Sequence, residues 1–300
     1  MNHTLIDPLT IPFSALGLGC VTFGREIDQG ASFVMMDHAL AHGITLFDTA
    51  SAYGGGASET IVGAWLTARR PARDTLIIAT KLLPPYEPVQ IMAAVDQSLQ
   101  RLGTDTIDLL YLHRWDPSIE TTAALETFQA LIQSGKIRML GASNFNAAQI
   151  SETLRRQAAL GYARLGSFQN NHNLAVSDID EAIFNIAAEH NIALVTYSPL
   201  GAGFLTGKYQ QGMPGSTRFS VIPGHQDIYF QEAACRRLDT LQKVAASTGH
   251  SPVHLALAWA MHQPGVTSVL VGGRNTAQLD QAFAAQAFND SAIFAALESA

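Results

Sequence analysis

The sequence predicts an α/β protein whose eight parallel strands close into a (β/α)₈ TIM barrel, with an N-terminal β-hairpin closing the bottom of the barrel. Three observations lead to this fold class. Eight short apolar runs are bounded by Gly, Pro, Asp or Ser, as buried strands are. Longer amphipathic stretches separate these runs, so each strand can be followed by a crossover helix and a further parallel strand. Eight such units need about 250 residues, and the chain has 300.

The expected elements follow one another in a regular order along the chain. Strands are expected at residues 15–23, 44–50, 75–81, 107–113, 137–144, 164–170, 192–198 and 267–273. Helices are expected between them, among others at residues 31–43, 58–70, 89–103 and 120–135. Several of these helices end in Gly, which favours helix termination. The hairpin is expected within residues 4–15, and residues 1–300 are expected to form one barrel domain.

A doubly wound open sheet is the alternative arrangement of alternating strands and helices. Such sheets usually bind a nucleotide through a G-x-G-x-x-G turn that follows the first strand. The corresponding stretch here is LGLGCVTFG, residues 16–24, and it lacks that spacing. The sequence therefore favours the closed barrel over the open sheet.

Composition and charge limit the functions that the chain can have. Hydrophobic residues make up 47% of the sequence and charged residues 14%, which is enough apolar material for a sizeable core. The formal charge of −7 argues against nucleic acid and anionic membranes as partners. No apolar run approaches the roughly 18 residues of a membrane span. The two cysteines, Cys20 and Cys235, and an N-terminus unlike a secretory signal favour a cytoplasmic protein.

Polar side chains follow three consecutive predicted strands, at the point where each strand ends. They are Asp48, Lys81 and His113, and Tyr53 comes shortly after the first of them. Catalytic residues of (β/α)₈ barrels lie at these C-terminal strand ends. Polar residues are also common there for a plainer reason, since loops begin at strand ends. The four residues are nevertheless a candidate catalytic set, because they would meet at one rim of the barrel.

These four residue types suit the reduction of a carbonyl group. A free tyrosine has a pKa of about 10, and a nearby lysine favours the phenolate and so lowers that value. A carboxylate beside the lysine keeps it charged, and the histidine can donate a hydrogen bond to a substrate oxygen. The glycines after Tyr53 would let the loop turn its phenol over the barrel mouth. The alternative is an Asp–Lys ion pair that closes the barrel, with Tyr53 as a surface aromatic.

The pattern resembles the aldo-keto reductase family along most of the chain. The matching segments are LFDTASAYGGGASE, IIATK, DLLYLHRWDP, GKIRMLGASNF, YSPLGAGFLTGKY and SVLVGGRNTAQL, and HRWDP with the SPLGAGFLTGK loop is similar to the aryl-alcohol and sugar-type branch. The resemblance implies an NADPH-dependent carbonyl reductase that works without a metal. It also implies that Asp48, Tyr53, Lys81 and His113 form the catalytic tetrad, with Tyr53 as the acid.

The resemblance further implies a set of NADP(H)-binding residues. Ser143, Asn144 and Gln169 would bind the nicotinamide carboxamide, and Tyr197 would stack on the ring. The loop after the seventh strand would cover the pyrophosphate, through Ser198, Leu200, Gly203, Leu205 and Lys208. Arg274 would bind the 2′-phosphate, because a planar guanidinium suits phosphate geometry, and Gly272 and Gln278 belong to the same end of the site. Ala282 departs from the family, which often has an asparagine there that contacts adenine.

The substrate is a small-molecule carbonyl or alcohol whose identity the sequence does not give. Candidate substrate-binding residues are Phe23, Trp115 and His172, with Tyr86, Phe219 and Tyr229 as further aromatic candidates. His172 lies in the unusual run Asn171-His172-Asn173, and it is equally compatible with an ordinary loop histidine. His250, His254 and His262 fit helix packing and do not suggest a metal site.

Three functions are compatible with these observations. The first is NADPH-dependent reduction of an aldehyde or ketone, of the aryl or sugar type. The second is the oxidative reaction of an NAD(P)-dependent sugar or alcohol dehydrogenase. The third is a cofactor-binding regulatory subunit, such as the potassium-channel β subunits of the same family. Arg274 favours NADP and reduction, and the complete set of four catalytic residues favours an enzyme. The oligomeric state is not predicted.

Overall fold

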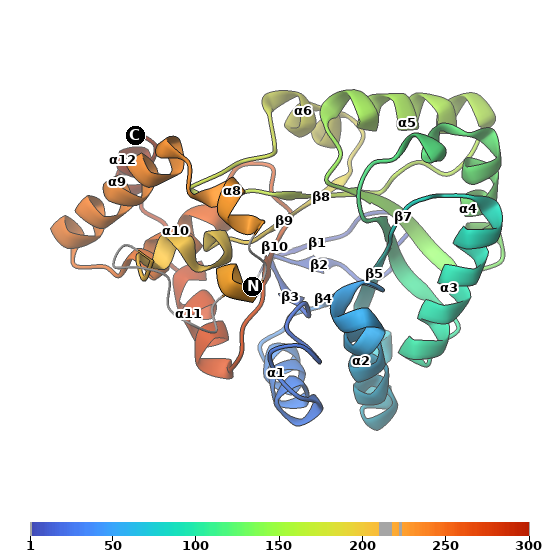
Figure 1. Ribbon diagram of the computed structural model, residues 1–300, viewed down its shortest axis with the longest axis horizontal. Helices are drawn as coiled ribbons and strands as arrows, with labels where there is room; N and C mark the ends of the chain where they lie inside the picture. The colour runs from blue at the N-terminus through green and yellow to red at the C-terminus, as the bar shows by residue number, and fades with distance from the viewer. Residues whose placement is uncertain (1, 210–217, 222–223, 300) are drawn as a thin grey trace.

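The computed structural model describes residues 2–209, 218–221 and 224–299 of the chain. Within these residues, eight parallel strands close into a barrel in the order β10-β3-β4-β5-β6-β7-β8-β9 (Figure 1). The barrel strands are β3 Leu16–Gly19, β4 Leu46–Asp48, β5 Ile77–Leu82, β6 Ile107–Leu112, β7 Ile137–Ser143, β8 Ser167–Asn171, β9 Ala193–Tyr197 and β10 Ser268–Val271. The predicted (β/α)₈ barrel is confirmed, and the open sheet is excluded.

Helices surround the barrel and connect its strands. They are α1 Gln29–Ala41, α2 Ala57–Ala68, α3 Pro88–Leu102, α4 Thr122–Gln133, α5 Ala147–Leu160, α6 Glu181–Glu189, α7 Arg218–Val221, α8 His225–Tyr229, α9 Glu232–Thr248, α10 Pro252–Met261, α11 Thr276–Gln286 and α12 Ser291–Glu298. In Figure 1, α1 to α6 pass around the bottom, right and top of the barrel, and α9 to α12 lie on its left. None of the helices in the described ranges combines the length and apolarity needed to cross a membrane.

The barrel strands bury both of their faces, which explains their near-continuous apolar sequence. Side chains at every second position, such as Leu46, Ile77 and Ala79, form a cluster inside the barrel. The alternate positions, such as Phe47 and Ile78, join the larger cluster between the barrel and the helices. Because successive strand residues point to opposite faces, this alternation also fixes which residues at the strand ends point toward the barrel axis.

The predicted hairpin lies at the bottom of the barrel. Its strands, β1 His3–Thr4 and β2 Phe13–Ser14, pair antiparallel. The amide of Ser14 donates to the hydroxyl of Thr45, at the point where the chain enters β4. The hairpin adds three apolar side chains to the cluster inside the barrel, namely Ile6, Leu9 and Phe13. The hairpin therefore covers the N-terminal ends of the strands, and it does not cover the rim formed by their C-terminal ends.

Candidate active site

The C-terminal ends of the barrel strands surround a cavity of about 710 Å³. Asp48 ends β4, Lys81 lies near the end of β5, and His113 follows β6 directly. Each of them continues the inward-facing alternation of its strand, so all three side chains point toward the barrel axis. All three line the cavity together with Tyr53. The structure thus brings together the four residues that the sequence singled out.

Asp48 and Lys81 form an ion pair that is almost completely buried. Their side chains are 2% and 1% exposed. The Lys81 ammonium donates to Asp48 Oδ1, to the carbonyl oxygen of Thr49 at 2.8 Å and to the hydroxyl of Tyr53 at 3.2 Å. Burial acts to lower the pKa of Lys81, but Asp48 and Tyr53 outweigh it, so this pKa lies above its ordinary value. Lys81 is therefore held as a cation, with one of its three donors directed at the phenol.

Tyr53 reaches the lysine because the chain turns sharply after β4. A short 3₁₀ turn, Tyr53–Gly56, precedes α2. Gly54 and Gly55 within it have φ values of 58° and 63°, in the left-handed region that glycine adopts without strain. The phenol also lies under the ammonium, since Lys81 Nζ is 4.8 Å from the centre of the Tyr53 ring. The predicted folding of this loop over the barrel mouth matches the structure.

The pKa of Tyr53 differs from the sequence-based expectation. Burial raises the pKa of this phenol above its ordinary value, and the opposing effect of Lys81 is smaller. The expectation that Lys81 brings the phenol pKa down overall is therefore wrong for this site, because it left out the cost of placing a phenolate where water is scarce. The phenol remains protonated at neutral pH, which is the form that a proton donor requires.

His113 lies beside Tyr53 on the cavity wall. The two rings meet edge to face, with centres 5.9 Å apart. Burial, followed by the charges of Lys81 and Arg114, lowers the pKa of His113 to about 3. Its Nδ1 atom is buried and has no hydrogen-bond partner among the described residues. His113 is therefore neutral at physiological pH, and one of its ring nitrogens can carry a proton for a hydrogen bond into the cavity.

Side-chain amides and a tyrosine hydroxyl continue the cavity wall across β7, β8 and β9. Gln169 donates its amide hydrogen to Asp48 Oδ2 at 2.9 Å, so it fixes the second oxygen of that carboxylate. Asn144 donates to the carbonyl oxygen of His113 and accepts from the hydroxyl of Tyr197 at 2.6 Å. The sequence did not reveal these contacts between the wall residues and the candidate catalytic residues. They hold Asp48 and the His113 segment in fixed positions.

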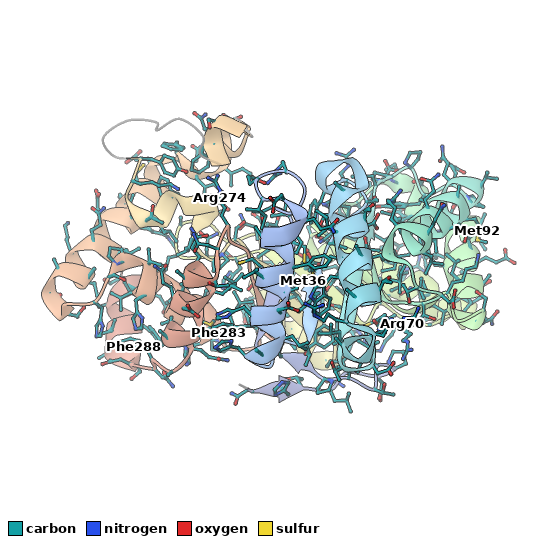
Figure 2. All side chains as sticks on the ribbon, turned by 90° about the horizontal axis from the view of Figure 1, so that it is seen from below. Met36, Arg70, Met92, Arg274, Phe283 and Phe288 are labelled. Carbon is teal, nitrogen blue, oxygen red and sulfur yellow. The ribbon has the colours of Figure 1, made fainter. Side chains whose placement is uncertain are left out.

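The far end of the cavity is basic and lies at the start of α11. Arg274 and Gln278 line it, Lys208 lines the same cavity from the loop after β9, and Figure 2 shows Arg274 on the side of the molecule opposite the N-terminal hairpin. The amide of Arg274 donates to Gln278 Oε1 at 2.7 Å, which fixes the turn into the helix. A basic side chain beside a helix N-terminus, with a second one on the wall of the same cavity, forms an environment that suits phosphate groups. The residues present therefore fit a phosphate-bearing cofactor.

Most of the predicted cofactor residues line this same cavity. They are Ser143, Asn144, Gln169, Tyr197, Ser198, Leu200, Gly203, Lys208, Gly272, Arg274 and Gln278. Leu205 is the exception, because its side chain is fully buried in the core and does not reach the cavity. It anchors the loop that carries the neighbouring residues.

The predicted substrate residues do not line the cavity. Phe23 is fully buried in the core, and half-buried Trp115 packs against the same core cluster with its Nε1 atom buried. His172 is 6% exposed and lies between Trp259 and Phe184, behind the barrel wall. A substrate-binding role for these three residues therefore stays a prediction, and none of them lines the cavity described above. His172 points away from the barrel axis because side chains alternate along a strand: Gln169 and Asn171 point inward, and the next residue points outward.

The further aromatic candidates also pack inside the protein. Tyr86 donates its hydroxyl hydrogen to the carbonyl oxygen of Arg114 at 2.7 Å and is 1% exposed. Phe219 and Tyr229 are buried against each other, and they support the loop that follows β9. These rings therefore position loops and do not form cavity walls.

Two charged residues of the cavity wall were not singled out from the sequence. Arg25 and Glu26 lie in the loop between β3 and α1, line the cavity and pair with each other at 2.6 Å. A general rule could have identified them, because in a (β/α)₈ barrel every loop that follows a strand lies at the catalytic rim. They make this part of the wall polar.

The chain is similar over nearly its whole length to proteins of one family. The model of the Aldo/keto reductase family matches residues 15–296. Aldo-keto reductase YhdN of Bacillus subtilis is 34% identical over 297 residues, which cover 93% of this chain and 87% of YhdN. Protein tas of Escherichia coli is 31% identical over an alignment of 320 residues, which covers 93% of this chain and 91% of tas. Aldo-keto reductase yakc of Schizosaccharomyces pombe, named with NADP(+), is 29% identical over 294 residues. The match covers 92% of this chain and 84% of yakc.

Proposed function

The chain belongs to the aldo/keto reductase family, and we propose that it reduces an aldehyde or ketone to the alcohol with NADPH, using Tyr53 as the proton donor. One observation carries the proposal. The Lys81 ammonium contacts both the Asp48 carboxylate and the Tyr53 hydroxyl at the wall of the cavity. That arrangement supports a phenol that gives up a proton and a cation that stabilises the phenolate left behind.

The proton moves from the Tyr53 hydroxyl to the carbonyl oxygen of the substrate. The phenol is protonated beforehand, because burial raises its pKa. As the proton leaves, negative charge develops on an oxygen 3.2 Å from the Lys81 ammonium, and a preorganised charge at that distance favours the transfer. Asp48 keeps Lys81 in place, and Gln169 keeps Asp48 in place. Bound NADPH would supply the hydride to the carbonyl carbon.

His113 orients the carbonyl group. It is neutral near pH 7, since its pKa is lowered to about 3. A neutral imidazole donates one hydrogen bond to the carbonyl oxygen without competing with Tyr53 for the role of acid. The bond from Asn144 to the backbone oxygen of His113 fixes the segment that carries the ring. Tyr53 and His113 thereby approach the same substrate oxygen from two sides.

NADP(H) would occupy the part of the cavity that extends toward α11. Asn144, Gln169 and Tyr197 would hold the nicotinamide end, and Lys208 and Arg274 would hold the phosphates. Arg274 at that end supports a 2′-phosphorylated cofactor. The name of the S. pombe relative, which specifies NADP(+), points in the same direction.

The substrate class is best described as a small aldehyde or ketone. An aromatic pocket for flat aryl aldehydes depended on Phe23 and Trp115, and neither lines the cavity. Arg25 and Glu26 add charged groups to the wall, in the loop whose Thr22 donates to the carbonyl oxygen of Gly273 beside Arg274, so aryl and sugar-type carbonyls both stay within the proposed class. Reduction is proposed as the main direction, with oxidation of the corresponding alcohol as its reverse.

An assay with both cofactors tests this function. Purified protein is mixed with NADPH or NADH and a panel of aryl aldehydes, short aliphatic ketones and open-chain sugars, and the absorbance of the reduced nicotinamide is followed. We expect turnover with NADPH and slower turnover with NADH. Cofactor binding without turnover in either direction would instead support a regulatory subunit. Absence of NADPH binding would overturn the proposal.

A further inference from the structure

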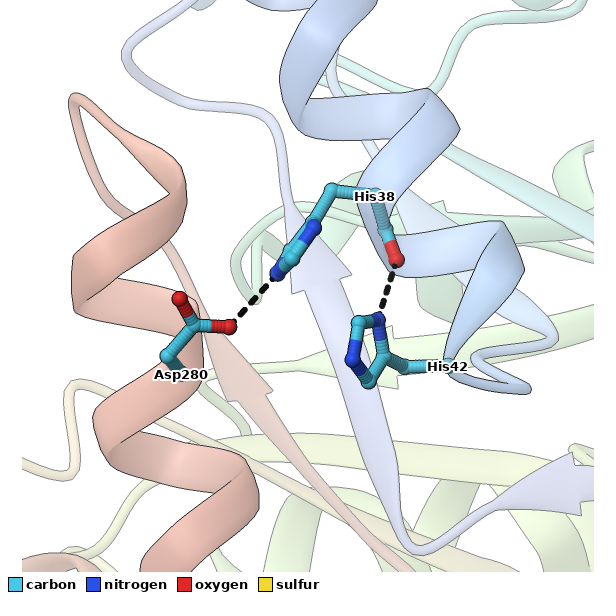
Figure 3. A group of neighbouring side chains, drawn as sticks. All are labelled: His38, His42 and Asp280. Carbon is cyan, nitrogen blue, oxygen red and sulfur yellow. Dashed lines mark hydrogen bonds and ion pairs between the residues drawn. The ribbon is translucent and has the colours of Figure 1, made fainter.

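Two histidines and an aspartate meet on the outside of the barrel, away from the cavity. His38 lies in the last turn of α1 and His42 caps that helix, while Asp280 belongs to α11. One possible ligand atom from each lies within 4.8 Å of the others (Figure 3). The histidines are four residues apart, so they occupy the same face of the helix. Among the described residues, no other group of this kind brings three such ligands together.

The hydrogen bond of His42 prepares its ring to bind a metal ion. His42 Nδ1 lies 2.8 Å from the carbonyl oxygen of His38. A carbonyl oxygen can only accept, so Nδ1 carries the hydrogen, and in the neutral ring the lone pair is on Nε2. Metal-binding histidines almost always donate their second N–H to a carboxylate or a backbone carbonyl in this way. The ring also stacks on Phe283 with centres 4.3 Å apart, which fixes its plane.

His38 and Asp280 supply the other two ligands. His38 Nε2 and Asp280 Oδ1 are 2.7 Å apart, across the gap between α1 and α11. In a tetrahedral zinc site with bonds of about 2.1 Å, ligand atoms lie about 3.4 Å apart. The observed separations of 2.7 Å and up to 4.8 Å lie on either side of that value. The exposed Asp280 can adjust by a small rotation of its side chain, because nothing in a buried core has to move.

We propose that this cluster is a Zn²⁺-binding site that fastens α11 to α1. Two imidazoles and one carboxylate suit Zn²⁺, whereas Mg²⁺ and Ca²⁺ prefer oxygen ligands throughout. Zn²⁺ replaces the proton that His38 Nε2 shares with Asp280, and water completes the coordination. Phe283 of α11 packs against the rings of His38 and His42 of α1, so the cluster lies where the two helices meet. The ion therefore braces the helix whose N-terminal end faces the cavity.

Calorimetry with defined variants tests the site. Untagged protein is stripped with a chelator and titrated with Zn²⁺, and Co²⁺ absorption reports the ligand geometry. We expect one Zn²⁺ per chain and a higher unfolding temperature in its presence. Asp280→Asn and His42→Ala should each weaken binding by more than about 100-fold, since even an outer partner costs about 10–100-fold. Asp280→Asn keeps the size of the side chain and an acceptor for His38, so the variant remains folded.

A second pair of histidines provides the matched control. His250 and His254 are also four residues apart and also pack on a phenylalanine, Phe288, but no carboxylate joins them in the part of the chain that the structure describes. His254→Ala should therefore leave Zn²⁺ affinity unchanged. Equal affinity of the wild type, Asp280→Asn and His42→Ala for Zn²⁺ would overturn the proposal. So would an absence of Zn²⁺ binding by the wild type, which would leave His38 and Asp280 as a simple ion pair.

Discussion

Each end of the barrel buries an aspartate, and the two ends use it differently. At the rim, Asp48 pairs with Lys81, and both are almost fully buried. At the bottom, Asp108 of β6 is 2% exposed and pairs with Arg73 and Arg138, which are 20% and 45% exposed. Burial raises the pKa of both aspartates, and in each case the neighbouring cation acts in the opposite direction. At both ends, a cation offsets the cost of burying a carboxylate.

The difference lies in where the remaining donors of the cation are directed. Arg73 gives its other hydrogens to the carbonyl oxygens of Leu76 and Thr106, so it joins the starts of neighbouring strands. Lys81 gives one of its hydrogens to the Tyr53 hydroxyl, which faces the cavity. A buried ion pair is therefore no sign of catalysis by itself. It becomes one when the cation also contacts a group that can exchange a proton with a ligand.

The largest expected effect is on turnover, and it distinguishes the phenol of Tyr53 at the rim from the phenol of Tyr111 inside the barrel. Tyr53→Phe removes the proposed acid and little volume, so turnover should fall by about 10²–10⁴-fold, with NADPH affinity retained. Tyr111→Phe is the control, since Tyr111 bonds Ser167 at 2.7 Å in the barrel interior and does not line the cavity. That variant should keep most of its turnover. Steady-state kinetics and cofactor fluorescence titration measure both, and near-normal turnover of Tyr53→Phe would remove the phenol from the mechanism.

The next effect compares the two cations. Lys81→Met leaves Asp48 buried without its cation, so the free energy of unfolding should fall by about 3–5 kcal/mol, and turnover should fall with it. Arg73→Met leaves Asp108 with Arg138 and with the amide of Ile78. Its unfolding free energy should fall by about 1.5–3 kcal/mol, with turnover close to that of the wild type. Urea unfolding and kinetics on both variants give the comparison, which fails if Arg73→Met loses activity as Lys81→Met does.

The sequence predicted the rim better than the loops above it, and the reason is periodicity. Asp48, Lys81, His113 and Gln169 follow inward-facing strand positions, so strand boundaries alone placed them on one surface. Trp115 lies past the end of its strand, where no periodicity applies, so its direction could not be predicted. The same alternation that places Gln169 inward turns His172 outward, where it packs against Trp259 and Phe184.

A third effect concerns the basic end of the cavity. Arg274→Ala should weaken NADPH binding by roughly 1.5–3 kcal/mol, or about tenfold to a hundredfold, because one charge-assisted contact with the 2′-phosphate is lost. NADH lacks that phosphate and should bind almost as before. Arg155→Ala, on the exposed face of α5, is the control for a general loss of positive charge. Equal weakening of both cofactors would show that Arg274 does not contact the 2′-phosphate.

The smallest effect contrasts buried His172 with half-buried His113, and of the two only His113 lines the cavity. Burial lowers the pKa of His172 from 6.5 to about 4, so between these values the unfolded chain binds a proton that the folded protein does not. The contribution of neutral His172 to the free energy of unfolding is therefore fully present above about pH 6.5. It decreases as the pH falls toward 4. His172→Gln cannot titrate, so from pH 6.5 to about 5 its unfolding free energy should fall by about 1–2 kcal/mol less than that of the wild type.

His113→Gln is the matched variant at the rim, because the pKa of His113 is also lowered, to about 3. It should flatten the same part of the stability profile, and it should also lose turnover, since the hydrogen bond to the substrate oxygen is altered. His172→Gln should keep its turnover, because this side chain packs against Trp259 and Phe184 and does not line the cavity. Urea unfolding at a series of pH values, with kinetics at neutral pH, measures both properties. A loss of turnover in His172→Gln equal to that in His113→Gln would show that contact with the cavity is not what distinguishes a catalytic buried histidine here.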